Sequence, residues 1–314
     1  MADIKLILLL SENWTMIDAR DVRGQVTLAV EAEQTGFDGV MVSDHVVMGD
    51  GADANGLPVN PRDFVMPGTQ HPSTPWPSSI VILSAVAAVT RKVRIISGAI
   101  IAPLRHPLLL AKELATIDLM AEGRLVVLPT VSWHKAEFDA LGVPFERRGE
   151  ILDEQLAIWQ ALWRGSPVSF HGKHFNFDNV WFEPTAYRTT GPTLWFGSGT
   201  LHNRLLNRLA RYGSGFLPLG PMSESDVARI AAALRDAGRD ISEIEIPGGI
   251  AGRFEDSSSC ADLDVALRTL EPQLRAGVRT FVVKPSQFIQ DVAHFRDFAQ
   301  ELVEKCNRIA RGIA

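Results

Sequence analysis

The chain has 314 residues, 46% of them hydrophobic, and a formal net charge of -6 at pH 7. This length and composition support a sizeable core. The negative charge argues against nucleic acid or an anionic membrane as the main partner and favours a small-molecule substrate. Cys260 and Cys306 lie far apart, so neither a disulfide framework nor a metal site is predicted. No signal peptide or membrane-length apolar run is found, and a reducing cytoplasm is the expected location.

Eight short apolar segments, separated by stretches with helical spacing, have the composition of buried strands. Several helices are expected to end at a left-handed glycine just before a strand, as at Gly36, Gly213 and Gly277. This alternation, with no linker, predicts one α/β domain over residues 1–314 that forms a (β/α)8 TIM barrel rather than an open doubly wound sheet. The predicted strands are Ile4–Leu10, Gly39–Ser43, Val93–Ile101, Arg124–Leu128, Thr193–Gly197, Gly215–Leu217, Ile244–Ile250 and Arg279–Val283.

Two long segments interrupt the alternation, and loops of this length are usually functional or partly disordered. Residues 46–77, rich in glycine and proline, follow the second strand, and we expect them to act as a lid over the mouth of the barrel. Residues 165–192 precede the fifth strand and contain Phe170, Phe175, Phe177, Trp181 and Phe182, which either pack together as a second insertion or line an apolar site.

The second strand ends in Ser43-Asp44-His45, which places a carboxyl group and an imidazole where barrels bind ligands. An imidazole titrates near working pH, so His45 is a candidate proton donor or acceptor. The alternative is that Asp44 and His45 only satisfy backbone groups of the loop.

Three other strands carry candidate binding features. Gly98, inside the third strand, predicts a bulge or a close backbone approach, or is an ordinary strand glycine. Gly197-Ser198-Gly199-Thr200, between a strand and a helix starting at Leu201, predicts a phosphate-binding turn, or else a simple helix cap. Pro129 cannot donate a ladder hydrogen bond, so the fourth strand should end or bulge there. Trp133, which follows it, would either wall an apolar substrate or serve in packing.

Taken together, several motifs resemble the bacterial-luciferase-like superfamily, and Ser43-Asp44-His45 resembles its branch that uses the deazaflavin coenzyme F420. The resemblance runs from the first strand to about Leu217. The other motifs that carry it are Pro103-Leu104-Arg105-His106-Pro107, Gly123-Arg124-Leu125, Trp133-His134-Lys135-Ala136-Glu137-Phe138 and Leu141-Gly142-Val143-Pro144-Phe145.

The resemblance implies a TIM-barrel oxidoreductase with the cofactor ring at the carboxyl end of the barrel. Asp44 would lie by the ring and His45 would face the reacting centre. A non-prolyl cis peptide bond at Gly98-Ala99 would press against the ring, and the cofactor phosphate would bind residues 197–200. Relatives usually have a glycine-rich end to the fourth strand, whereas this chain has Thr130 and Ser132, which we assign to cofactor binding in a shifted ring position. Trp133 stands where one subgroup has a catalytic glutamate, so we place it beside His45 in the catalytic set and expect that second carboxylic acid to be missing.

Three alternative functions are compatible with these features. The first is hydride transfer between F420 and a small apolar substrate, with His45 moving the proton. The second is an FMN-dependent monooxygenase whose reduced flavin comes from a partner reductase. The third is a non-catalytic flavin-binding barrel. Similar proteins are typically dimers, so a homodimer is expected.

Overall fold

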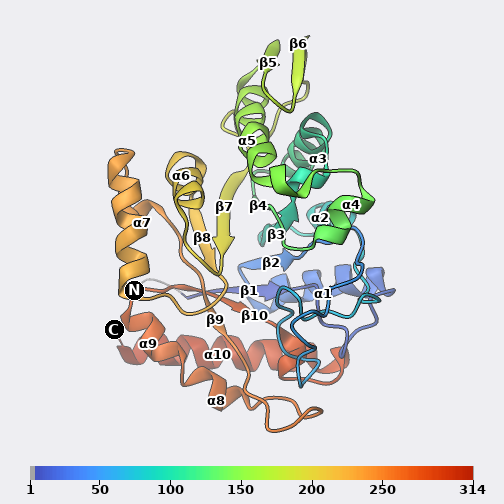
Figure 1. Ribbon diagram of the computed structural model, residues 1–314. Helices are drawn as coiled ribbons and strands as arrows, with labels where there is room; N and C mark the ends of the chain where they lie inside the picture. Colours follow the sequence, from blue (N-terminus) through green and yellow to red (C-terminus); the bar gives the residue numbers. More distant parts are fainter. Residues whose placement is uncertain (1–3, 314) are drawn as a thin grey trace.

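The computed structural model describes residues 4–313, and its centre is an eight-stranded parallel sheet rolled into a barrel (Figure 1). The strands follow the order β8-β7-β4-β3-β2-β1-β10-β9. All eight coincide with predicted segments, which confirms the TIM-barrel-like α/β fold. Their bounds are β1 (Lys5–Leu9), β2 (Gly39–Val42), β3 (Arg94–Ile101), β4 (Leu125–Thr130), β7 (Thr193–Ser198), β8 (Gly215–Pro218), β9 (Gly248–Ile250) and β10 (Thr280–Val283).

A short parallel bridge pairs Gly215 of the edge strand β8 with Glu245, which precedes the other edge strand, β9. The backbone N–H of Phe216 donates to the Glu245 carbonyl at 2.9 Å, and the Glu245 N–H donates to the Ser214 carbonyl at 3.0 Å. The segment before β9 therefore closes the barrel against β8.

Helices surround the barrel, and at least one follows each barrel strand (Figure 1). Within residues 4–313, no helix is both long enough and apolar enough to cross a membrane. The helices are α1 (Val22–Thr35), α2 (Ser79–Val89), α3 (Pro107–Met120), α4 (Lys135–Ala140), α5 (Arg148–Arg164), α6 (Asn203–Tyr212), α7 (Glu224–Asp236), α8 (Leu263–Leu267), α9 (Leu270–Arg275) and α10 (Phe295–Ile313).

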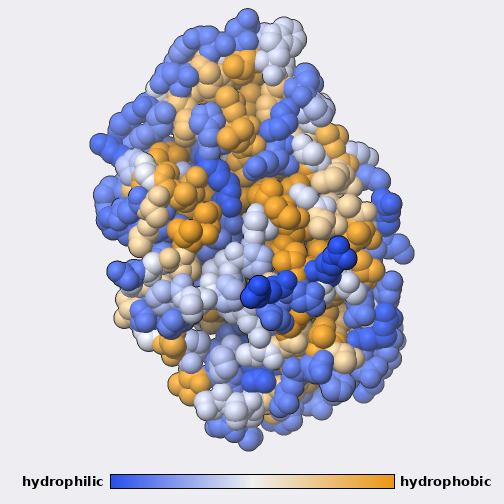
Figure 2. Space-filling model, turned by 90° about the vertical axis from the view of Figure 1, so that its right-hand side faces the viewer, coloured by the Kyte–Doolittle hydropathy of each residue, from blue (hydrophilic) through white to orange (hydrophobic). Residues whose placement is uncertain are grey.

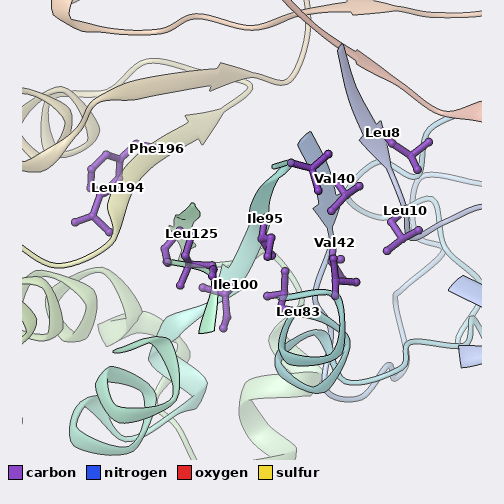
Figure 3. Packing of buried hydrophobic residues seen from close by; sticks show 14 of the residues in the cluster. Leu8, Leu10, Val40, Val42, Leu83, Ile95, Ile100, Leu125, Leu194 and Phe196 are labelled. Atoms are coloured by element: carbon purple, nitrogen blue, oxygen red, sulfur yellow. The ribbon is translucent and has the colours of Figure 1, made fainter. Parts of the chain in front are cut away.

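Alternate residues of the strands build two separate apolar clusters, because successive side chains of a strand point to opposite faces. The larger cluster lies between strands and helices; Figure 3 shows Leu83 of α2 beside Val42 of β2 and Ile100 of β3. The smaller one fills the inside of the barrel, and we call it the interior cluster. Its buried members are Ile7, Leu9, Met41, Ile96, Val126, Leu128 and Trp195.

Two local predictions need correction. Gly36 and Gly277 have φ angles of 98° and 91°, as expected of left-handed helix ends, but Gly213 has an extended conformation with φ of -84°. Close packing explains the glycine at position 213 instead, since a Cβ there would lie 2.9 Å from the Leu209 carbonyl oxygen. The fourth barrel strand does not end at Leu128 but continues through Pro129 to Thr130. The irregularity falls on β3, whose register against β4 shifts between Gly98 and Ile100.

The second insertion, residues 165–192, contains an antiparallel hairpin of β5 (Val168–His171) and β6 (Asn176–Val180), which the sequence analysis did not predict. The hairpin stands at one end of the molecule, beyond α5 (Figure 1). The Glu154 carboxylate of α5 holds its turn by accepting the backbone N–H groups of residues 173, 174 and 175. The interpretation of residues 1–314 as one domain stays a prediction.

Candidate functional site

His45 lies directly beyond the carboxyl end of β2 and is surrounded by aromatic rings. Its side chain is only 8% exposed. The ring centroid lies 5.1 Å from that of Trp76 and 5.9 Å from that of Trp133, and Trp14 packs edge-on against Trp76 at 5.1 Å. The structure thus brings the two predicted catalytic residues together. It also adds Trp14 and Trp76, which the sequence analysis did not select because neither lies in a recognisable motif.

A fully buried carboxylate, that of Glu137 in α4, contacts His45. Its Oε2 atom lies 3.1 Å from Nδ1 of the imidazole. Its Oε1 atom accepts the backbone N–H groups of Val46 at 2.5 Å and Val47 at 3.4 Å. The other ring nitrogen of His45, Nε2, makes no hydrogen bond with any residue that the structure describes.

The sequence analysis assigns no role to Glu137 and expects no carboxylic acid at the position of Trp133. The structure places the Glu137 carboxylate against His45. It comes from the helix after Trp133, not from the position of Trp133 itself, and the contact joins residues 92 positions apart in the chain. Separation of that size leaves no local signal in a single sequence.

His134 forms a second link between α4 and the start of residues 46–77. Its Nε2 atom accepts the backbone N–H of Gly49 at 2.8 Å, which requires that nitrogen to be unprotonated. Burial lowers the pKa of His134; the Glu137 carboxylate raises it and His45 lowers it further. The net direction keeps the ring neutral at neutral pH, as the contact requires.

Asp44, predicted to lie beside the cofactor, has a carboxylate occupied by protein groups. Arg105 binds it in a two-pronged ion pair at 2.8 and 2.9 Å. The Ser79 hydroxyl donates at 2.7 Å and the Ile101 N–H at 3.0 Å. Asp44 therefore ties together β2, α2 and the carboxyl end of β3, and its contact with a cofactor stays a prediction.

The peptide bond between Gly98 and Ala99 is cis, which confirms that expectation. It lies at the register shift between β3 and β4. A Cβ at Gly98 would stand 2.7 Å from both Cγ and Sδ of Met41, so the packing of the interior cluster already requires glycine here. Ala99 packs against the same cluster. The contact of both residues with a cofactor ring stays a prediction.

Thr130 and Ser132 shape the chain just beyond β4 and before Trp133. The Ser132 N–H donates to Oγ1 of Thr130 at 3.3 Å, and Ser132 has a positive φ of 55°. The Ser132 hydroxyl is buried, and no residue described in the structure gives it a hydrogen-bond partner. A buried hydroxyl without a partner is unusual, and a polar group of a bound ligand would satisfy it.

The predicted phosphate-binding turn borders a cavity of about 280 Å³ beyond β7 and β8. Ser198, Gly199 and Thr200 line it, together with Arg229 of α7, whose Nη2 donates to the Leu201 carbonyl at 3.2 Å. Gly197 does not line the cavity; a Cβ there would lie 2.7 Å from the Leu217 carbonyl oxygen, so close strand packing requires the glycine.

The helix after this turn begins later than predicted, at Asn203, because the His202 ring caps it by accepting the Leu205 N–H at 3.2 Å. Burial lowers the pKa of His202, and the positive charges of Arg208 and Arg204 lower it further. Arg204 and Arg208 therefore place positive charge near the start of this helix. Arg229 was not predicted because it reaches the turn from a helix beyond the next strand.

Residues 46–77 cross the mouth of the barrel. Phe64 packs against the interior cluster, and the buried Lys284 ammonium, just after β10, donates to the Asp63 carbonyl at 2.6 Å. Asn60 donates to the carbonyl oxygens of Asp256 and Ser259, both at 2.9 Å. Burial lowers the pKa of Lys284, while the charges of Glu12 and Asp63 raise it. This segment therefore covers the site from β2 to the loops after β9 and β10.

Comparison with solved structures shows the same fold in a monooxygenase and in an F420-dependent dehydrogenase. The long-chain alkane monooxygenase LadA aligns with a TM-score of 0.72 and 15% identity, over 100% of this chain and 92% of that one. An F420-dependent secondary alcohol dehydrogenase, solved with an F420–acetone adduct, aligns with a TM-score of 0.69 and 16% identity, over 98% and 99% of the two chains.

Sequence comparison gives a more specific result. The FMNH2-dependent dimethylsulfone monooxygenase of Pseudomonas putida is 28% identical over 176 residues, which are 55% of this chain and 42% of that protein. The matched stretches span about half the length of the first curated relatives. The family model for luciferase-like monooxygenases matches residues 6–261, most of the chain. The chain therefore belongs to the luciferase-like monooxygenase family of oxidoreductases.

Proposed function

We propose that this protein transfers hydride between coenzyme F420 and a small apolar organic substrate, with His45 as the proton donor or acceptor. The proposal rests on the hydrogen bonding of the two ring nitrogens of His45. Its Nδ1 contacts the Glu137 carboxylate, whereas its Nε2 has no hydrogen-bond partner among the described residues, and the rings of Trp76 and Trp133 pack beside the imidazole. Hydride transfer to or from a carbon–oxygen bond requires a proton at the oxygen, which a positioned imidazole can supply or take up.

The residues around the barrel mouth fit such a cofactor at two separated places. The cavity beside Ser198, Gly199 and Thr200 offers two hydroxyls and the Arg229 guanidinium, which suit a phosphate, and the Asp226 carboxylate lines it as well. The cis Gly98-Ala99 peptide lies within β3, and the Ser132 hydroxyl, which has no hydrogen-bond partner among the described residues, lies just beyond the neighbouring strand β4; the ring would bind beside them. Bound F420 would supply the carbon that gives or accepts hydride. The chain's own residues would hold it, exclude water and move the proton.

The second candidate function is oxygen insertion with reduced FMN, and the first curated relative favours it, since that protein is an FMNH2-dependent monooxygenase. The phosphate site suits FMN equally well. In that case a separate flavin reductase would have to provide the reduced cofactor.

We also propose a homodimer located in the cytoplasm. Adjacent helices α2 and α3 expose Val81, Val89, Leu109 and Met120. Figure 2 is turned toward the side on which these helices lie in Figure 1, and it shows hydrophobic surface gathered along the middle of this face. An apolar surface of this kind favours a partner. Both cysteines are unpaired, which agrees with a reducing compartment.

A binding titration separates these functions. The purified protein is titrated with F420 and, separately, with FMN, and then assayed with F420 and a panel of apolar secondary alcohols, ketones and conjugated alkenes. The proposal expects tighter binding of F420 than of FMN, and a change in F420 absorbance with at least one substrate. Binding of FMN alone would support the monooxygenase. Binding of neither at micromolar concentration would leave the non-catalytic barrel.

A further inference from the structure

We propose that Glu137 is the positioning residue of His45: it fixes the imidazole with its proton on Nδ1, so that Nε2 is the atom that exchanges a proton with the substrate. This inference rests on the proposed role of His45. It assigns a function to a side chain that neither touches the expected reacting centre nor belongs to the motif that ends β2.

The argument begins with the contacts of the carboxylate. Oε1 of Glu137 faces two backbone N–H groups, those of Val46 and Val47, which can only donate. Oε2 faces Nδ1 of His45 at 3.1 Å. A carboxylate is an acceptor at both oxygens, so all three contacts are satisfied together when Nδ1 carries the proton. The partner of one ring nitrogen sets which tautomer the imidazole adopts.

Packing holds the ring in the orientation that this contact selects. Trp76 and Trp133 lie close to the imidazole, and Trp133 stands two residues before α4, the helix that carries Glu137. Glu137 is fully buried and His45 nearly so, so water does not compete strongly for the hydrogen bond. The remaining nitrogen, Nε2, has no partner among the described residues and is left for proton exchange.

A purely structural role would not need a carboxylate. The amide oxygen of a glutamine would accept the Val46 and Val47 N–H groups equally well and would fill nearly the same volume. Only the second oxygen distinguishes the two side chains. In glutamine that position is an NH2 group, which donates to Nδ1 and moves the imidazole proton to Nε2. Glu137→Gln therefore separates the support of the backbone from the control of the tautomer.

The first test needs neither cofactor nor substrate. Protein labelled with 15N-histidine is examined by long-range 1H–15N NMR at alkaline pH, where imidazoles are neutral, and the His45 signals are assigned by their loss in His45→Ala. The proposal expects the protonated nitrogen to be Nδ1 in the wild type and Nε2 in Glu137→Gln. A proton on Nε2 in the wild type would overturn the proposal, as would an unchanged tautomer in a folded Glu137→Gln protein. If that variant does not fold, the wild-type spectrum alone decides.

The second test measures turnover. Glu137→Gln should lose two to four powers of ten in kcat, the usual contribution of a correctly protonated acid or base, with KM nearly unchanged. The matched control is Asp139→Asn, on the same helix and exposed, which should leave both the tautomer and kcat unchanged. A flipped tautomer with normal turnover would remove His45 from the chemistry while leaving the positioning role intact, so failure of the proposed function is distinguishable from failure of this inference.

Discussion

Arg105 donates hydrogen bonds from Nη1 and Nη2 to the two oxygens of the buried Asp44 carboxylate, at 2.8 and 2.9 Å. The pair joins the residue before His45 to the turn after β3 and so fixes the backbone at His45.

Arg105→Ala would leave a buried negative charge with only Ser79 and the Ile101 N–H as partners. We expect the free energy of unfolding to fall by about 3 kcal/mol, as when one partner of a buried pair is removed. Lys135→Ala, which breaks a pair whose side chains are both more than half exposed, is the control and should cost at most about 0.5 kcal/mol. Equal losses of stability in urea denaturation would refute the structural role of Asp44.

Glu245 closes the barrel at the end opposite the site and makes its stability depend on pH. Burial raises the pKa of Glu245, but the hydrogen bond and charge of Arg94, together with the Thr280 hydroxyl, outweigh burial, so the net shift is downward from 4.5. A lowered folded-state pKa adds stability above the unfolded pKa, and this stability is lost as the pH falls through the folded value. The stability difference between wild type and Glu245→Gln should therefore be largest near about pH 7 and shrink toward about pH 3. A difference that grows in acid, measured by denaturation at both pH values, would contradict this assignment.

Arg229 offers a test of the proposed phosphate site that does not involve His45. Its guanidinium lines the cavity beside Ser198 and Thr200. Since Arg229 is exposed, its contact with a phosphate should be worth about 1 kcal/mol, so Arg229→Ala should weaken cofactor binding roughly fivefold. Arg235→Ala, on the same helix but away from the cavity, should bind normally. Isothermal titration calorimetry with whichever of F420 and FMN binds the wild type compares the two variants. If Arg229→Ala and Arg235→Ala bind this cofactor with the same affinity, the phosphate binds elsewhere.

The segment over the barrel mouth should be held by Lys284 and Asn60. Lys284→Met removes one hydrogen bond between this segment and the chain after β10, and Asn60→Ala removes two between this segment and the loop after β9. Amide hydrogen exchange of residues 56–66 should become faster in both variants, because local opening requires fewer contacts to break. Asn55→Ala, which removes only a contact within the segment to the Pro67 carbonyl, is the control. Protection unchanged in Lys284→Met would show that the segment is anchored by Phe64 and its other contacts.

Much of the fold could be predicted from the sequence because strand composition and helix periodicity are local properties. Each barrel strand was recognised from its apolar run, and the second insertion from its interruption of the pattern. The hairpin at 168–180 was missed because half of its residues are exposed and polar, which removes the apolar signal. The resemblance supplied the cis peptide at Gly98-Ala99, which no composition indicates.

The candidate site was predicted only in part, because its contacts join distant residues. His45 and Trp133 were selected from their positions after strands, and the structure brings them together. Glu137, the partner of His45, comes from a helix 92 residues away. Arg105 belongs to a motif that the sequence analysis quotes. Its ion pair with Asp44, however, forms only because β2 and β3 lie side by side in the folded barrel. Candidate reactive residues are therefore easier to identify from a sequence than the contacts between them.

The most direct test of the proposed function is turnover by His45→Ala with F420 and the substrate found in the panel. This variant removes the imidazole but leaves the phosphate cavity and Ser132 intact, so F420 affinity should stay within a few-fold of the wild type. We predict that turnover falls by two to four powers of ten, the usual contribution of a general acid or base. Turnover equal to that of the wild type would contradict the role of His45 in proton transfer.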